Sequence, residues 1–157
     1  MTQRVLIVYD GKEDSTIERM ARGIANGVRS EGLEAICVAV GQAKASDLEA
    51  YEGIIFGSPC HFAGPSAKIK AFMDSTWPSR GRLEGKVGAA FTASAHIGGG
   101  NELTLHALLD FFLVHGMVVQ GDCQGDYFGA VALNPTGEPD EVMVDDSGDC
   151  HRLGARV

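Results

Sequence analysis

A loop of small, polar and aromatic side chains follows a strongly apolar segment in the first half of the chain. The run Ile54 to Phe56 ends abruptly in Gly57-Ser58-Pro59, and a turn-rich stretch leads into a segment with helical spacing of apolar residues. In an open α/β sheet, ligands bind beyond the carboxyl ends of the strands. A flat ring can therefore lie against this loop, held by backbone groups and by His61 or Phe62.

A second candidate loop lies between the first apolar run and the first helical segment. Residues 11–16 read Gly-Lys-Glu-Asp-Ser-Thr, at a position where a phosphate gains from free N–H groups and the helix dipole. Ser15 and Glu18 also form an S-x-x-E capping box, so Ser15 is either a helix cap or a phosphate ligand. Glu13 and Asp14 oppose an anion, and Lys12 can offset one of these charges.

The third candidate loop follows the fourth apolar run and contains three consecutive glycines, Gly98 to Gly100. They indicate a close approach of the backbone to a ligand, or else a flexible turn. Asn101 is expected to cap the next helix. His115 ends that helix before Gly116, which is typical of structural capping and also leaves a functional role open. Cys60 is interpreted as a small lining residue.

Apolar runs and helical periods alternate along the whole chain, which predicts an α/β fold. We expect a doubly wound, five-stranded parallel sheet in a single domain over residues 1–157. The helix expected from Ser147 has no stop signal, as if it were cut short at Val157. The predicted strands are 4–9, 34–40, 53–58, 86–93 and 117–121; the predicted helices are 15–31, one opened by Pro65, 101–115 and one from Ser147; and 122–149 is expected to be irregular.

Composition restricts the possible partners. The chain has 157 residues, 45% hydrophobic and 22% charged, with a formal net charge of −8. This charge argues against nucleic acid and anionic membranes as partners, and no apolar stretch approaches the roughly 20 residues of a membrane span. The four cysteines are scattered without metal-ligand spacing, so we expect no metal site and a reduced, cytoplasmic protein.

Taken together, these motifs resemble those of a known family. The order of elements is similar to flavodoxin-like domains, and the details resemble the tryptophan-repressor-binding-protein-like NAD(P)H:quinone oxidoreductases. The resemblance covers nearly the whole chain and rests on GSPCHFAGPSAKIKAFMD, GGGNE and HGM. It implies noncovalent FMN, with NAD(P)H as the electron donor.

The resemblance also implies site residues. The family's phosphate loop follows the pattern S-x-T-G-N-T, of which this chain keeps only the last threonine, and Asp14 stands where the pattern has glycine. His96 and His115 fall where catalytic contacts to the acceptor are expected. The implied cofactor residues are Gly11, Lys12, Ser15 and Thr16 for the phosphate, Pro59, Cys60, His61, Phe62 and Ala63 on one side of the flavin, and Thr92, Ala93, Ser94, Ala95, His96 and Gly98 on the other.

Three functions are compatible with the sequence. The first is an FMN-dependent oxidoreductase that reduces a small, quinone-like acceptor. The second is a flavodoxin-type electron carrier, whose acidic surface would suit docking to a basic redox protein. The third is a flavin-free domain that acts as a scaffold or binding module. The family resemblance also implies a homodimer or homotetramer.

Overall fold

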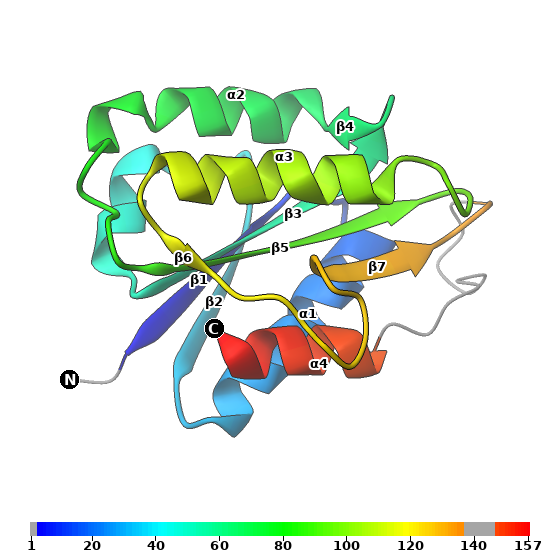
Figure 1. Cartoon of the computed structure of the whole chain (residues 1–157), viewed down its shortest axis with the longest axis horizontal. Helices are drawn as coiled ribbons and strands as arrows, with labels where there is room; N and C mark the ends of the chain where they lie inside the picture. Colours follow the sequence, from blue (N-terminus) through cyan, green and yellow to red (C-terminus); the bar gives the residue numbers. More distant parts are fainter. Residues whose placement is uncertain (1–2, 137–146) are drawn as a thin grey trace.

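A parallel β-sheet with helices on both faces forms the framework of the protein. A computed structural model describes residues 3–136 and 147–157. The sheet runs in the order β2-β1-β3-β5-β6, with β7 also pairing with β5 and the short β4 with β3 (Figure 1). The long parallel strands are β1 (Arg4–Tyr9), β2 (Glu34–Ala39), β3 (Gly53–His61) and β5 (Val87–Ser94). This arrangement confirms the predicted doubly wound α/β fold.

The position of the fifth strand is filled in two pieces. β6 (Val118–Val119) pairs with the start of β5, and β7 (Ala130–Leu133) pairs with its end, Phe91 to Ser94. Only two residues of the expected strand 117–121 are therefore strand, and the expectation that 122–149 is irregular was wrong for β7. Residues 137–146 of that segment lie outside the described part of the chain.

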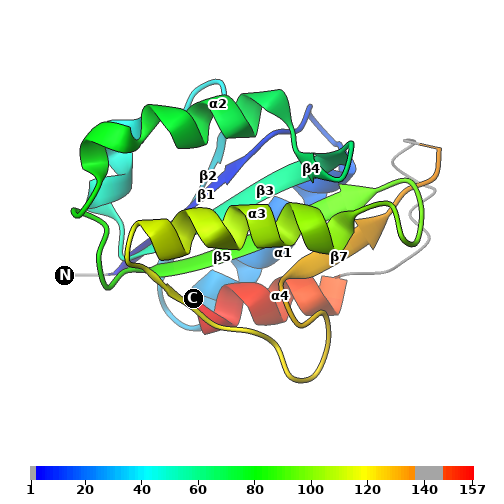
Figure 2. The same cartoon turned by 45° about the horizontal axis from the view of Figure 1, so that its top comes forward.

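Alternation along the buried strands divides the core into two layers. In β1, Val5 and Ile7 face one helix layer, whereas Leu6 and Val8 face the other. The first layer contains α1 (Thr16–Ser30) and α4 (Ser147–Arg156), and the second contains α2 (Ala67–Ser75) and α3 (Asn101–Val114) (Figure 2). Short 3₁₀ helices, η1 (Ala45–Ala50) and η2 (Trp77–Ser79), complete the connections.

One predicted helix start and one predicted helix cap were wrong, for local reasons. Pro65 belongs to β4 (Gly64–Pro65), and the buried hydroxyl of Ser66 caps α2 by accepting from the N–H of Ile69. Asn101 is the first residue of α3 and not its cap. The cap position is taken by Gly100 at φ 96°, a left-handed conformation that glycine adopts without steric cost.

Among the described residues, no helix combines the length and apolar character needed to cross a membrane. The described residues likewise contain no group of three or more His, Cys, Asp or Glu side chains that could hold a metal ion.

Candidate functional site: a pocket at the carboxyl ends of the strands

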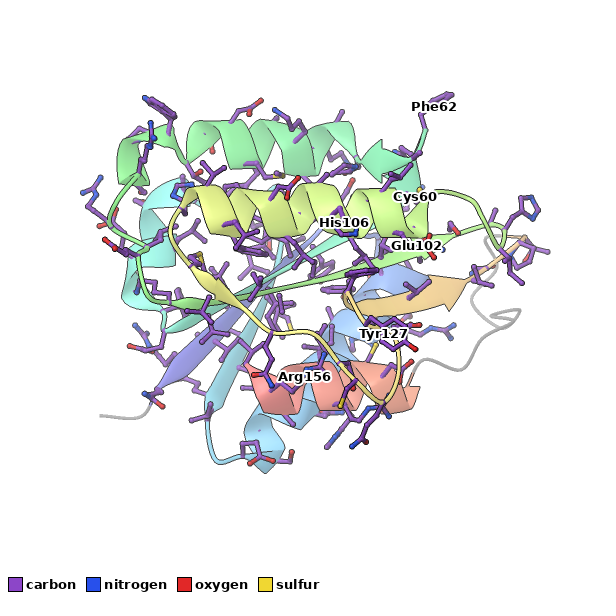
Figure 3. All side chains as sticks on the ribbon, in the orientation of Figure 1. Cys60, Phe62, Glu102, His106, Tyr127 and Arg156 are labelled. Atoms are coloured by element: carbon purple, nitrogen blue, oxygen red, sulfur yellow. The ribbon has the colours of Figure 1, made fainter. Side chains whose placement is uncertain are left out.

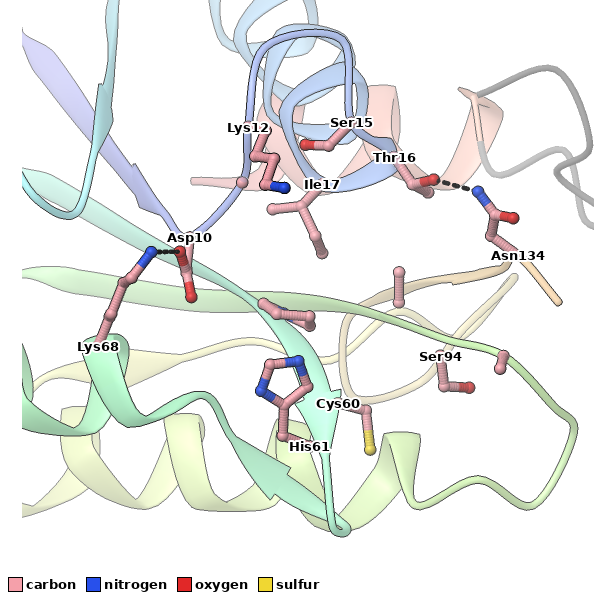
Figure 4. A pocket seen from close by; sticks show the side chains of 14 residues that line it. Asp10, Lys12, Ser15, Thr16, Ile17, Cys60, His61, Lys68, Ser94 and Asn134 are labelled. Atoms are coloured by element: carbon pink, nitrogen blue, oxygen red, sulfur yellow. Dashed lines mark hydrogen bonds and ion pairs between the residues drawn. The ribbon is translucent and has the colours of Figure 1, made fainter. Parts of the chain in front are cut away.

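A cavity of about 430 Å³ opens where β1, β3, β5 and β7 end (Figure 4). Its volume falls in the range of small-molecule sites, roughly 300–1,000 Å³. Its place at the carboxyl edge of the sheet is the one expected for doubly wound folds. The lining residues are Asp10, Gly11, Lys12, Ser15, Thr16, Ile17, Pro59, Cys60, His61, Lys68, Ala93, Ser94, Ala95 and Asn134.

One end of the pocket is the loop between β1 and α1. Ser15 is the N-cap of α1, and its hydroxyl accepts from the N–H of Glu18 at 3.3 Å. A side chain at Gly11 would collide with this hydroxyl, because a Cβ there would lie 2.6 Å from Ser15 Oγ. Ser15, Thr16 and Lys12 all line the cavity. This end combines hydroxyl donors, a cation and a helix N-terminus, the features that bind a phosphate.

The two acids of this loop do not line the pocket. Glu13 is exposed. Asp14 adopts φ 57°, and its carboxylate pairs with Arg22 at 3.3 Å. Its backbone N–H donates to the carboxylate of Glu18 at 2.6 Å, and this hydrogen bond is the main reason why the pKa of Glu18 is lowered. The Ser15–Glu18 capping box is thus half realised, since Glu18 reaches Asp14 and not the N–H of Ser15.

A charged pair forms part of the pocket lining. Asp10 follows the last residue of β1, and Lys68 lies in the first turn of α2. Their side chains approach to 3.5 Å (Figure 4). Lys68 is therefore a second cation of the site beside Lys12, and Asp10 offsets one of these two charges.

The second loop leaves β3 and turns back through β4. Pro59, Cys60 and His61 line the cavity, whereas Phe62 and Ala63 form the tip at φ 51° and 59°. Phe62 is fully exposed at 108% and projects away from the molecule (Figure 3). The structure therefore brings only the first three of the five residues expected on this side to the pocket.

Buried hydroxyls fix the base of this loop. Ser58 Oγ accepts from the N–H of Ser66 and donates to the carbonyl of Pro59, both at 2.8 Å. Thr92 Oγ1 donates to the carbonyl of Ser58 at 2.7 Å. Thr92 is fully buried and does not line the cavity. Its hydroxyl therefore contacts the backbone that supports the loop and not the pocket.

The end of β5 contributes Ala93 and Ser94 to the lining, and the third loop, after β5, contributes Ala95. His96 and Gly98 are exposed and lie outside that lining. The triple glycine has a packing role as well, because a Cβ at Gly100 would lie 2.6 Å from Ala63 Cα. Cys60 Sγ also donates to the carbonyl of Gly99 at 3.1 Å. The glycines thus let two loops meet.

His115 lies far from this pocket in the fold, at the C-terminal end of α3. The residue is only 6% exposed, and its Nε2 is 3.1 Å from Thr76 Oγ1. Burial is the main cause of its lowered pKa, and the charge of Arg80 adds to it. Its ring packs against Phe111 at a centroid distance of 4.7 Å. His115 is nevertheless the C-cap of α3, and Gly116 follows it at φ 75°. The expected capping geometry is thus confirmed, while the lowered pKa opposes a positive charge on the ring.

Sequence reasoning missed four lining residues, Asp10, Ile17, Lys68 and Asn134. Asp10 adjoins the recognised loop, so its position in the sequence was a usable signal. Lys68 carries no signal of its own among the lysines of α2. Asn134 could not be found without β7, which ends at the residue before it.

Known proteins share the sequence pattern of this chain. Residues 39–125 match the NADPH-dependent FMN reductase family. The chain is 32% identical over 189 aligned residues to a NAD(P)H dehydrogenase (quinone) from Archaeoglobus fulgidus, which covers 98% of this chain and 95% of that protein. It is 35% identical over 131 residues to a flavodoxin from Clostridium saccharobutylicum, covering 83% of this chain and 76% of the other.

A solved structure shows the same relation in three dimensions. The flavodoxin, WrbA-like protein from Agrobacterium tumefaciens matches with a TM-score of 0.79 at 27% identity, covering 99% of this chain and 95% of that chain. These matches confirm the resemblance drawn from the loop motifs. The chain belongs to the NADPH-dependent FMN reductase family.

Proposed function

We propose that this protein binds FMN noncovalently and reduces a quinone-like acceptor with electrons from NAD(P)H. The observation that carries the proposal is the asymmetry of the pocket. One end offers hydroxyls, a lysine and a helix N-terminus, and the other offers the strand-end segments Pro59–His61 and Ala93–Ala95. A ligand with a phosphate at one end and a flat ring at the other fits both.

The family relation supports this assignment independently of the pocket. The matching family is described as NADPH-dependent FMN reductase, and the relative from Archaeoglobus fulgidus is named NAD(P)H dehydrogenase (quinone). Bound FMN supplies the hydride and electron chemistry, so the protein need only bind, orient and tune it. No side chain has to act as a nucleophile.

Different residues of the pocket bind the phosphate, orient the ring and donate a proton. The phosphate is held by Lys12, Ser15 and Thr16, and the segments at the ends of β3 and β5 orient the ring. His61 is exposed and lines the cavity, so it is well placed to donate a proton to an acceptor at the open face. His96 belongs to the neighbouring loop and is the second candidate for this role.

His115 is not assigned a catalytic role within one chain. Its ring is buried between Phe111 and Thr76, at the opposite end of α3 from the triple-glycine loop. The hydrogen bond to Thr76 and the burial of the ring account for its presence there.

An electron carrier is the second candidate, because the relative from Clostridium saccharobutylicum is named flavodoxin. A carrier needs FMN and a redox partner, but no acceptor pocket. The two candidates differ in their response to NAD(P)H: the enzyme oxidises it in the presence of FMN and a benzoquinone, whereas the carrier ignores it and passes single electrons to a redox protein.

The test begins with titration of the purified apoprotein with FMN, followed by flavin fluorescence. Quenching with a saturable endpoint is expected, and NAD(P)H oxidation with a benzoquinone should then require FMN. Binding of FMN without NAD(P)H oxidation would favour the carrier. Absence of FMN binding would favour the flavin-free scaffold.

Two further properties are expected, the first from the family resemblance and the second from the cysteines. We expect a homodimer or homotetramer, which size-exclusion chromatography with light scattering measures. We also expect a cytoplasmic location; Cys37, Cys60 and Cys123 are free thiols, as is typical of proteins in a reducing compartment.

A further inference from the structure

Asn134 connects the end of the sheet to the phosphate loop across 118 positions of sequence. It follows β7 directly and is only 9% exposed. Its Nδ2 donates to Thr16 Oγ1 at 2.7 Å (Figure 4). Both residues line the pocket. The end of β7 therefore places a buried side-chain amide against Thr16, the first residue of α1.

The orientation of this amide is set by its other contacts. The backbone N–H of Asn134 donates to the carbonyl of Ser94 at 2.8 Å, which continues the β5–β7 pairing by one residue. The hydroxyl of Thr136 donates to Asn134 Oδ1 at 3.5 Å. With Oδ1 engaged as an acceptor, the donor Nδ2 faces Thr16.

This contact determines what the hydroxyl of Thr16 can do. A hydroxyl carries one donor proton and two acceptor lone pairs, and an amide N–H can only donate. Thr16 Oγ1 therefore accepts from Asn134, and its own proton is directed elsewhere. Ser15 is held in the same way, since its hydroxyl accepts from the N–H of Glu18 at 3.3 Å. Two adjacent hydroxyls thus keep their protons for an acceptor in the cavity that they line.

We propose that Asn134 is a positioning residue that presets Thr16 as a hydrogen-bond donor to the flavin phosphate, and so sets the preference for FMN over riboflavin. This inference rests on the proposed FMN site. Asn134 does not contact the phosphate itself; it acts through Thr16. A hydroxyl whose proton is already available donates to a phosphate without first breaking a hydrogen bond, which favours binding of the phosphorylated flavin.

The experiment compares the dissociation constants of FMN and riboflavin for the apoprotein, which requires no turnover. Wild type, Asn134→Ala, Thr16→Val and the double variant are titrated by flavin fluorescence. Loss of a hydrogen bond to the phosphate should weaken FMN binding about tenfold in Thr16→Val. Asn134→Ala should show part of that loss, riboflavin affinity should be unchanged in both, and the double variant should bind FMN as Thr16→Val does.

A matched control is Asn101→Ala. Asn101 is also buried and donates its amide to a pocket residue, Ser94 Oγ, at 2.8 Å, but on the side of the ring. It should change FMN and riboflavin affinity by the same factor. Equal losses for both flavins in Asn134→Ala, or independent losses in the double variant, would show that Asn134 only supports the fold and would overturn the proposal.

The same titrations separate this inference from the proposed function. If wild-type protein binds FMN more tightly than riboflavin and Asn134→Ala keeps the same preference, Asn134 has no positioning role. The proposed FMN site is then unaffected. Wild-type protein that binds neither flavin overturns both.

Discussion

The helices α1 and α3 both begin at the carboxyl edge of the sheet, but their first turns are built differently. At α1, a serine side chain caps the helix and neighbouring hydroxyls and a lysine face the cavity. At α3, no side chain caps the helix, and Gly100 at φ 96° brings the backbone against Ala63. The same sheet edge thus carries one turn suited to an anion and another suited to loop packing.

The largest expected effect is on stability, at the first turn of α3, where the backbone packs against Ala63. Gly100→Ala places a side chain in the left-handed region and 2.6 Å from Ala63 Cα, which should cost about 2–5 kcal/mol of folding free energy. Gly98→Ala is the matched control, since Gly98 has φ 73° with nothing within 4 Å of the added Cβ, and should cost only about 1–2 kcal/mol. Denaturant unfolding measures both. Equal losses of folding free energy in the two variants would mean that the close approach of Gly100 to Ala63 is not required for stability.

The next largest effect is expected at the first turn of α1, which is the turn suited to an anion. Ser15→Ala removes the cap of α1 and should cost about 0.5–2 kcal/mol of stability, together with FMN affinity. Ser66→Ala removes the corresponding cap of α2, but Ser66 does not line the pocket, so this control should lose stability and keep FMN affinity. Calorimetry and fluorescence titration distinguish them. Similar FMN losses in both variants would contradict the assignment of the phosphate to the α1 turn.

A smaller effect is expected from the acid beside that turn. Asp14 is exposed and directed at Arg22, so removing its charge should tighten FMN binding by at most about 1 kcal/mol, and less at high salt. Asp14→Asn removes the charge and keeps a residue that tolerates φ 57°. Asp14→Gly removes the charge and also the steric cost of the left-handed backbone conformation at this position. Titrations at two salt concentrations measure the effect, and weaker binding by Asp14→Asn would show that the carboxylate holds the loop in place.

The smallest effect concerns pH and lies away from both turns. The pKa of His115 is lowered from 6.5 by burial and by Arg80, so the unfolded chain binds the proton more readily than the folded chain. Stability from His115 is therefore present above pH 6.5 and falls as the pH decreases below it. Unfolding of wild type and His115→Gln at pH 7 and at lower pH measures this. An equal pH response in both would show that His115 is not the titrating group.

The sequence predicted the sheet well because long apolar runs and helical periods are local signals. β1 was predicted at its observed bounds, and α1 differed by one residue at each end. β7 was missed because its four residues lie in a Gly- and Asp-rich segment and are strand only through their pairing with β5. Strand identity at this position depends on a partner about 40 positions away, which no local pattern contains.

The candidate site was predicted in part for the same reason. Residues at the ends of recognisable elements, such as Ser15 before α1 and His61 at the end of β3, were found because those elements have local sequence patterns. The contributions of Asn134 and Lys68 depend on which elements meet in space, and the outward turn of Asp14 depends on its ion pair with Arg22. Pattern reasoning therefore could not place the two acids outside the lining and missed the groups that complete the pocket.

The most direct test of the central claim is a titration of wild-type apoprotein with FMN, monitored by quenching of flavin fluorescence. We predict a saturable transition with a stoichiometry of one FMN per chain. Absence of quenching at about 100 µM FMN, where a complex of only about −5.5 kcal/mol would be half formed, would contradict the assignment of this pocket to FMN.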